Sequence, residues 1–256
     1  NAGGDVTTGV QNTIIGGLAG DALTIGSYNI AIGYSALGSE DSRGRAVAVG
    51  YNALATQNAD ADSYNTAVGF EAGKLVTTGT HNTFIGGLSG DATTTGGSNI
   101  ALGAYALSAN TTASNNSALG FSALEANTTG ANNTAVGWSA AKANTTGANN
   151  TALGTDALKA NTTAANNVAV GKDALLRNTT GAQNTSLGLA ALSLTTTGTY
   201  NTGVGYNAQS GSATASSQFT LGDSNVAELR CNDQSIGSLS DSRDKTDVID
   251  SPYGLD

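Results

Sequence analysis

Two consecutive stretches of seventeen residues decide the fold: "ANTTGANNTAVGWSAAK" at 126–142 and "ANTTGANNTALGTDALK" at 143–159. One glycine per unit continues this spacing along nearly the whole chain. The glycines are Gly16, Gly33, Gly50, Gly69, Gly86, Gly103, Gly120, Gly137, Gly154, Gly171, Gly188, Gly205 and Gly222. They lie 17 residues apart, except that 19 residues separate Gly50 from Gly69. A fixed period of this kind is the signature of a repeat protein, here with thirteen units that we call rungs.

Each rung carries a short segment with two different faces. The residue before the glycine is always Ile, Val or Leu, and the residue three before it is Thr, Ser, Val, Ile or, in the last rung, Phe219. Between them lies mostly Ala, as at Ala135 and Ala152. Because side chains alternate along a strand, the two outer columns share one face and Ala lies on the other. We therefore expect a strand that the glycine ends, with a turn that needs positive φ or leaves no room for a Cβ.

The remainder of the rung predicts a coil with a thin core. Three residues after the glycine, Ala fills eleven of the thirteen rungs, and Leu often follows it, which indicates a second short strand or a bend. The "NTTG" stretch then returns the chain as a loop and is made of poor helix formers. The sequence therefore predicts an all-β, parallel β-solenoid whose rungs stack about 4.8 Å apart, roughly 60 Å in total. Asn occupies the position four before the glycine in eleven rungs and is expected to serve the fold through ladders between rungs.

Composition restricts the possible partners. The net charge of −9 argues against a nucleic-acid partner. Cys231 is the only cysteine and His81 the only histidine, so the sequence predicts no disulfide within the chain, no metal site, no cofactor and no Ser-His-Asp triad. No apolar stretch reaches the roughly 18 residues of a membrane span, so no membrane insertion is expected. The chain is not expected to be an enzyme, and its start at Asn1 without Met suggests a fragment.

The aliphatic columns predict self-association. A thin solenoid that exposes a continuous aliphatic stripe would aggregate on its own. Burial of each Val or Leu contributes about 1.5–3 kcal/mol, so burying thirteen of them along one axis would dominate the energetics. A closed ring of three copies would hide the stripe, although the pattern alone leaves a dimer open.

A resemblance supports the trimer. The stretches "NTAVGWSAAKA" at 133–143 and "NIAIGYSAL" at 29–37 resemble the head repeats of trimeric autotransporter adhesins, and the match covers residues 6–222. The resemblance implies a left-handed β-roll that forms an intertwined homotrimeric fibre along the aliphatic strands. The present unit is longer than that of the family, and its "NTTG" loop has no role that the family supplies.

The stretch "SDSRDKTDV" at 240–248 resembles the start of the intramolecular chaperone domain that ends many phage tail fibres and tailspikes. By this resemblance Ser240 would be the nucleophile and Lys245 its activating base, Arg243 matches the motif, and the bond between Leu239 and Ser240 would be cut. The bulk of that domain is missing, so we expect no cleavage in this chain. The sequence thus divides into repeats at 1–210, a β-shaft or neck at 211–239 with Cys231 buried at its axis, and a truncated chaperone start at 240–256.

The position after the glycine is a candidate receptor-binding column. Its aromatic residues are Tyr34, Tyr51, Phe70, Phe121, Trp138 and Tyr206, and the first five are the candidates for receptor binding. Aromatic rings one rung apart can stack on each other, or they can form a platform for the faces of sugar rings.

These features together indicate a structural and receptor-binding homotrimeric fibre in a virion, most simply a phage tail fibre that attaches to a host surface. Its expected partners are further copies of itself, a glycan or protein receptor on the host, and other tail or fibre proteins. Two alternatives remain open at this point. One is a trimeric adhesin on an extracellular bacterial surface, and the other is the stalk of a glycan-degrading tailspike whose cleaving domain lies outside these residues.

Overall fold

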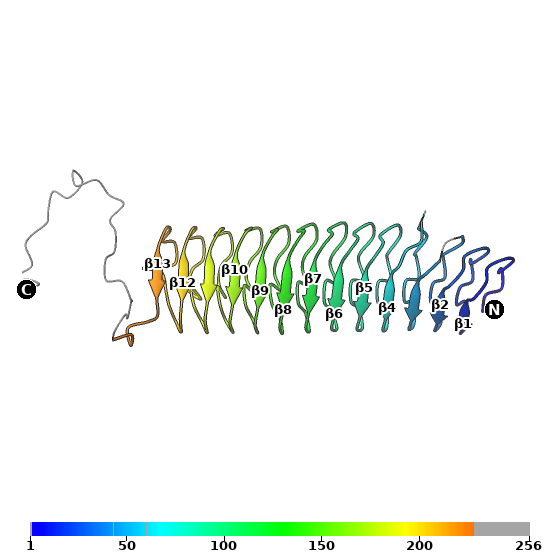
Figure 1. Ribbon diagram of the computed structural model, residues 1–256, viewed down its shortest axis with the longest axis horizontal. Coiled ribbons are helices and arrows are strands. Elements are labelled where there is room, and N and C mark those ends of the chain that lie inside the picture. The colour runs from blue at the N-terminus through cyan, green and yellow to red at the C-terminus, as the bar shows by residue number, and fades with distance from the viewer. Residues whose placement is uncertain (1, 43, 60, 228–256) are drawn as a thin grey trace, which may run out of the picture. The chain divides into compact units, whose positions relative to one another are not determined.

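The computed structural model describes residues 2–42, 44–59 and 61–227, and it contains one parallel sheet of thirteen strands in sequence order (Figure 1). Each strand has three residues. The strands are β1 (Thr13–Ile15), β2 (Ile30–Ile32), β3 (Val47–Val49), β4 (Thr66–Val68), β5 (Thr83–Ile85), β6 (Ile100–Leu102), β7 (Ser117–Leu119), β8 (Thr134–Val136), β9 (Thr151–Leu153), β10 (Val168–Val170), β11 (Thr185–Leu187), β12 (Thr202–Val204) and β13 (Phe219–Leu221). The predicted parallel β-solenoid is confirmed.

The register follows the sequence period. Ala135 of β8 pairs with Ala152 of β9, one period apart. Between β3 and β4 the pairing stays aligned, with Val47 opposite Thr66, so the two extra residues are accommodated outside the sheet. Close to this insertion, the Gln57 side chain donates to Glu40 Oε2 and Ser63 Oγ, both at 3.0 Å, inside the coil. The longer rung therefore keeps the strand column intact.

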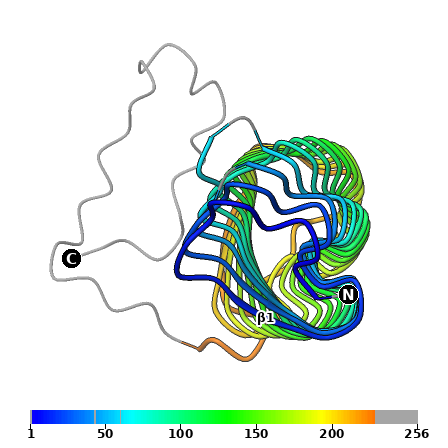
Figure 2. The same cartoon turned by 90° about the vertical axis from the view of Figure 1, so that its right-hand side faces the viewer.

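Two columns of buried side chains, one of Ala and one of Leu, build the core of the coil. The central residue of most strands is a fully buried Ala, such as Ala135, and it points into the coil, which Figure 2 shows end-on. After the glycine the sequence predicted either a second short strand or a bend, and the structure has a turn there. This turn buries a Leu four positions beyond the glycine in seven rungs. These residues are Leu37, Leu54, Leu107, Leu124, Leu158, Leu175 and Leu192.

The turns require left-handed backbone at residues other than glycine. In rung 9, φ is 58° at Asn149, 56° at Asp156 and 54° at Leu158, and the equivalent residues of other rungs behave alike. A left-handed residue other than glycine costs roughly 1–2 kcal/mol. Full burial of a Leu contributes about 1.5–3 kcal/mol, which is enough to offset the backbone cost of the same residue.

The glycine that ends each strand is required by close stacking as well as by its φ. Gly137 has a φ of 135°, and a Cβ added there would lie 2.5 Å from the carbonyl oxygen of Gly154 on the next rung. Real Cβ atoms do not approach backbone that closely, which confirms that the turn leaves no room for a side chain.

The asparagine four positions before the glycine links adjacent rungs. The backbone N–H of Asn133 donates to Asn116 Oδ1 at 2.9 Å, and Asn133 Nδ2 donates to the Gly147 carbonyl at 2.8 Å. The same pattern recurs along the column, as at Asn167. These ladders join side chain to backbone, so each buried amide is satisfied by the stacking itself.

A second asparagine column forms a ladder between side chains that the sequence reasoning did not assign. Asn144 Nδ2 donates to Asn127 Oδ1 at 2.8 Å, and Asn161 Nδ2 donates to Asn144 Oδ1 at 2.7 Å. The column begins at Asn110 and ends at Asn178. The "NTTG" loop thus carries a buried amide ladder and is part of the core.

The sheet continues to β13, which lies within the range 211–239 that was expected to form a shaft. Residues Asn1–Asp223 form one compact unit. The predicted chaperone start at 240–256 and Cys231 lie outside the described residues.

Candidate interaction face

Four columns of side chains project outward from the sheet. In rung 8 they are Asn132, Thr134, Val136 and Trp138, at two-residue spacing, and all four are exposed. Ala135, between the two outer strand residues of β8, is fully buried. Strand alternation thus places the polar flank, the two outer strand columns and the aromatic column on one surface, which we call the outer face.

The outer face is aliphatic along most of its length. Among its exposed residues are Ile15, Ile30, Ile85, Ile100, Leu119, Val136, Val168, Leu187, Phe219 and Leu221. Ile15 is 58% exposed and Leu119 47% exposed. Exposed apolar side chains that recur along a sheet in this way are typical of an interaction surface.

The first three predicted receptor-binding residues form one aromatic stack. The ring centroids of Tyr34 and Tyr51 are 5.6 Å apart, and those of Tyr51 and Phe70 are 5.4 Å apart. The rings are nearly parallel, with interplanar angles of 13° and 8°. They remain exposed, with Phe70 at 54%, so they both stack on each other and present ring surface to solvent.

The other two predicted residues form a separate group. Phe121 and Trp138 are exposed on successive rungs, but Gly87 and Ala104 occupy the same column between them and Phe70. Phe121 meets Tyr105 edge-on at 5.7 Å. The five candidate residues therefore make two aromatic groups along the column rather than one platform.

A further stack lies on the opposite flank of the outer face and was missed from the sequence. The rings of Tyr64 and His81 stack at 5.3 Å, and the Arg45 guanidinium lies 5.2 Å from the Tyr28 ring and 5.8 Å from that of Tyr64. Arg45 also pairs with Asp62. The four stacked residues share the position five before the glycine, and aligning the rungs on that position would have revealed them.

The other features considered from the sequence are His81, a metal site, a membrane span and the Ser240–Lys245 pair. His81 is exposed, and its Nδ1 lies 3.0 Å from Thr80 Oγ1. Within residues 2–42, 44–59 and 61–227, no cluster of His, Cys, Asp and Glu could hold a metal ion. The same ranges contain no helix long and apolar enough to cross a membrane. Ser240 and Lys245 lie outside the described residues.

Comparison with protein-family models, curated proteins and solved structures found no match to this chain. The outer face is the feature of this chain that bears most directly on function. Its aliphatic centre suits contact with another apolar surface, and its aromatic flanks offer ring faces with a polar rim, as at protein interfaces.

Proposed function

We propose that this chain forms the repeat segment of an intertwined homotrimeric fibre, a left-handed β-roll in a phage tail fibre that attaches to a host surface. The observation that carries the proposal is the outer face, where aliphatic residues stand exposed on rung after rung of the sheet. The resemblance of the repeats to trimeric adhesin heads adds to it.

Three copies would bury this stripe efficiently. Each coil is thin, and its aliphatic columns continue from rung to rung along the stacking direction, since every strand pairs in register with the next. Copies packed around a three-fold axis would each supply the same stripe, which closes the assembly and leaves no stripe in solvent. The aromatic columns would then lie at the rim of the interface, where they remain available to a receptor.

The assembly proposal is tested by placing charge in the stripe. Val136→Asp and Leu153→Asp would each bury one carboxylate per copy near the axis, at a cost on the order of several kcal/mol per ion. We expect both variants to dissociate or to fold poorly, measured by light scattering on the eluted peak and by circular dichroism. Thr129→Asp, on an exposed loop position of the same region, is the matched control and should leave the assembly unchanged. Charged stripe variants that keep the wild-type mass would contradict the proposal.

The receptor proposal is tested at the second aromatic group. Phe121→Ala with Trp138→Ala removes two exposed rings without altering a buried residue. If these rings contact a host glycan, binding on a glycan array should fall by about tenfold or more, because stacking on an aromatic ring contributes on the order of 1 kcal/mol per ring. Undiminished binding would remove these two residues from the receptor site.

A further inference from the structure

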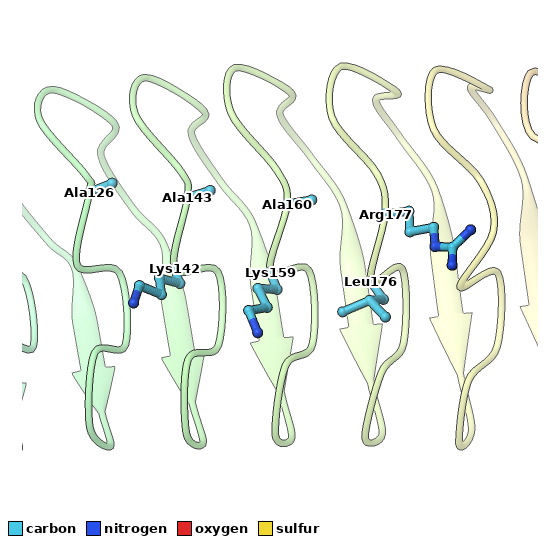
Figure 3. Close-up of a pocket in the computed structure, with 7 residues that line it drawn as sticks. All are labelled: Ala126, Lys142, Ala143, Lys159, Ala160, Leu176 and Arg177. Atoms are coloured by element: carbon cyan, nitrogen blue, oxygen red, sulfur yellow. The ribbon is translucent and has the colours of Figure 1, made fainter.

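An open groove crosses four consecutive rungs on the turn side of the coil (Figure 3). Its volume is about 540 Å³. It is lined by Ala126, Lys142, Ala143, Lys159, Ala160, Leu176 and Arg177. Figure 3 shows these side chains in two rows that run from rung to rung, so the groove follows the stacking direction.

The groove lies in the part of the repeat region that carries a net positive charge, although the protein as a whole is acidic. Residues 1–125 carry nine acids and three bases, a net −6, whereas residues 126–222 carry two acids and four bases, a net +2. Three of those four bases line the groove. Glu125 and Asp156 pair with two of these bases, so three bases and two acids leave the groove region a net charge of +1, which is the charge of Arg177.

Some of its positive charge is left unneutralised. Lys142 Nζ lies 3.2 Å from Glu125, and Lys159 Nζ lies 3.0 Å from Asp156. Arg177 is exposed and, among the residues that the structure describes, has no ion-pair partner. A guanidinium presents a planar fork of donors that matches a carboxylate.

The apolar surfaces of the groove suit a sugar. Its alanine row offers a flat strip of methyl groups with a repeat of one rung, about 4.8 Å, which is close to the length of one pyranose residue in an extended chain. Lys159, which lines the groove, extends toward the outer face, where its Nζ lies 5.2 Å from the centroid of the exposed Trp138 ring. A ring face beside a cation is the pair of groups that a carboxylated sugar needs.

We propose that this groove binds an extended acidic polysaccharide, with carboxylates toward Arg177 and the two lysines and sugar faces on the alanine row and Trp138. A polymer fits better than a compact anion because the cations are spread along the groove, in rungs 8, 9 and 11. Nucleic acid fits less well, because its dense phosphate charge needs more free cations than this acidic chain offers. The proposal names a ligand class for the receptor-binding part of the proposed function, and it does not depend on the trimer.

The test is calorimetric titration of the 256-residue protein with sodium polygalacturonate, with the fully methyl-esterified polymer as the uncharged control. We expect binding of the acidic polymer that weakens as salt is raised, and none of the ester. Lys142→Ser with Lys159→Ser and Arg177→Ala should weaken it at least about tenfold, since each surface charge contact contributes a factor of roughly two to five. These replacements copy residues already present at equivalent positions, Ser108 and Ala160.

Lys74→Ser is the matched control. Lys74 occupies the same rung position as Lys159 and likewise pairs at 3.0 Å with the acid three residues before it, but it lies outside the groove. Its variant should bind within about twofold of wild type. The proposal is overturned if wild type does not bind polygalacturonate, if the triple variant binds equally well, or if single-stranded DNA binds as tightly. A changed solution mass of the triple variant would also overturn it, because the groove would then be a contact between copies. A lost trimer with intact polymer binding would instead contradict only the assembly.

Discussion

At the scale of single residues, ladders of hydrogen-bonded Asn side chains hold the interior of this coil together. Such a ladder can leave a hydrogen-bonding group unpaired where it ends. The asparagine ladder stops at Asn178, whose Oδ1 is buried and accepts no hydrogen bond. The next rung has Thr195 in place of an asparagine, and its hydroxyl lies 3.0 Å from Ser210 Oγ. An unmatched buried acceptor carries a desolvation penalty of about 1–3 kcal/mol.

Thr195→Asn should therefore stabilise the protein. The new amide can donate to Asn178 Oδ1 and to the Gly198 carbonyl, as Asn178 itself does to Asn161 and Gly181. We expect a gain of about 0.5–1.5 kcal/mol, reduced by the lost bond to Ser210 and measured by chemical denaturation. Thr197→Asn, on the exposed side of the same loop, is the control and should change little. If Thr195→Asn destabilised the protein while Thr197→Asn did not, the Asn ladder could not be extended to position 195.

A second residue-scale prediction concerns pH. Burial raises the pKa of the Asp91 carboxyl, and the nearby Glu71 raises it further, while a backbone hydrogen bond and Lys74 act in the opposite direction. Because the folded pKa lies above the unfolded value of about 3.9, the folded state holds this proton more tightly. The contribution of Asp91 to stability is therefore greatest below the unfolded pKa, and it is lost as pH rises through the folded pKa.

Asp91→Asn should then raise the unfolding temperature at about pH 7 and have little effect at about pH 3, where the wild-type carboxyl is already protonated. Thermal melts at the two pH values, compared with the exposed-site control Asp5→Asn, measure this difference. Equal effects of Asp91→Asn at both pH values would contradict the assigned cause.

At the scale of one rung, core volume is exchanged between two positions. Most rungs combine a small strand centre with a Leu four residues after the glycine, as at Ala101 and Leu107. Rung 5 reverses this, with Phe84 at the strand centre and Gly90 in the turn. A Cβ on Gly90 would lie 2.5 Å from the Phe84 ring, so the two residues fill one space.

The exchange predicts strong coupling between the two sites. Phe84→Ala alone should cost about 3–5 kcal/mol through the cavity that it leaves, and Gly90→Leu alone should overpack the rung. Together they recreate the common rung, so the double variant should be markedly more stable than the sum of the two single effects. Denaturation of all four proteins of this cycle measures the coupling. Additive effects would mean that the two positions do not share a space.

The elements also show how far the sequence alone could go. The strand centres and the outer columns followed from two-residue alternation around Gly137 and its equivalents. The ladder through Asn144 and the groove at Arg177 did not, because they depend on how the chain folds between the glycine and the next strand. That path is set by residues with left-handed backbone conformation, such as Asp156 and Leu158. Unlike a glycine, these residue types do not by themselves predict a positive φ.

At the scale of the whole molecule, the outer face is the surface through which copies of the chain are proposed to associate. Within the described residues, the coil pairs its buried Asn side chains between rungs, except at Asn178 Oδ1, and it buries its small core, but it leaves much of its aliphatic columns in solvent. The candidate receptor residues flank those columns on the same face, and their place at a rim or within an interface depends on how copies associate. The basic groove lies on the turn side of the coil.

The solution mass of the chain tests this account most directly. Multi-angle light scattering on the eluting protein should give three times the chain mass of 25.1 kDa, with no dissociation on dilution. A soluble, folded species at the mass of one chain would contradict the account, because the exposed aliphatic stripe would then be stable without a partner.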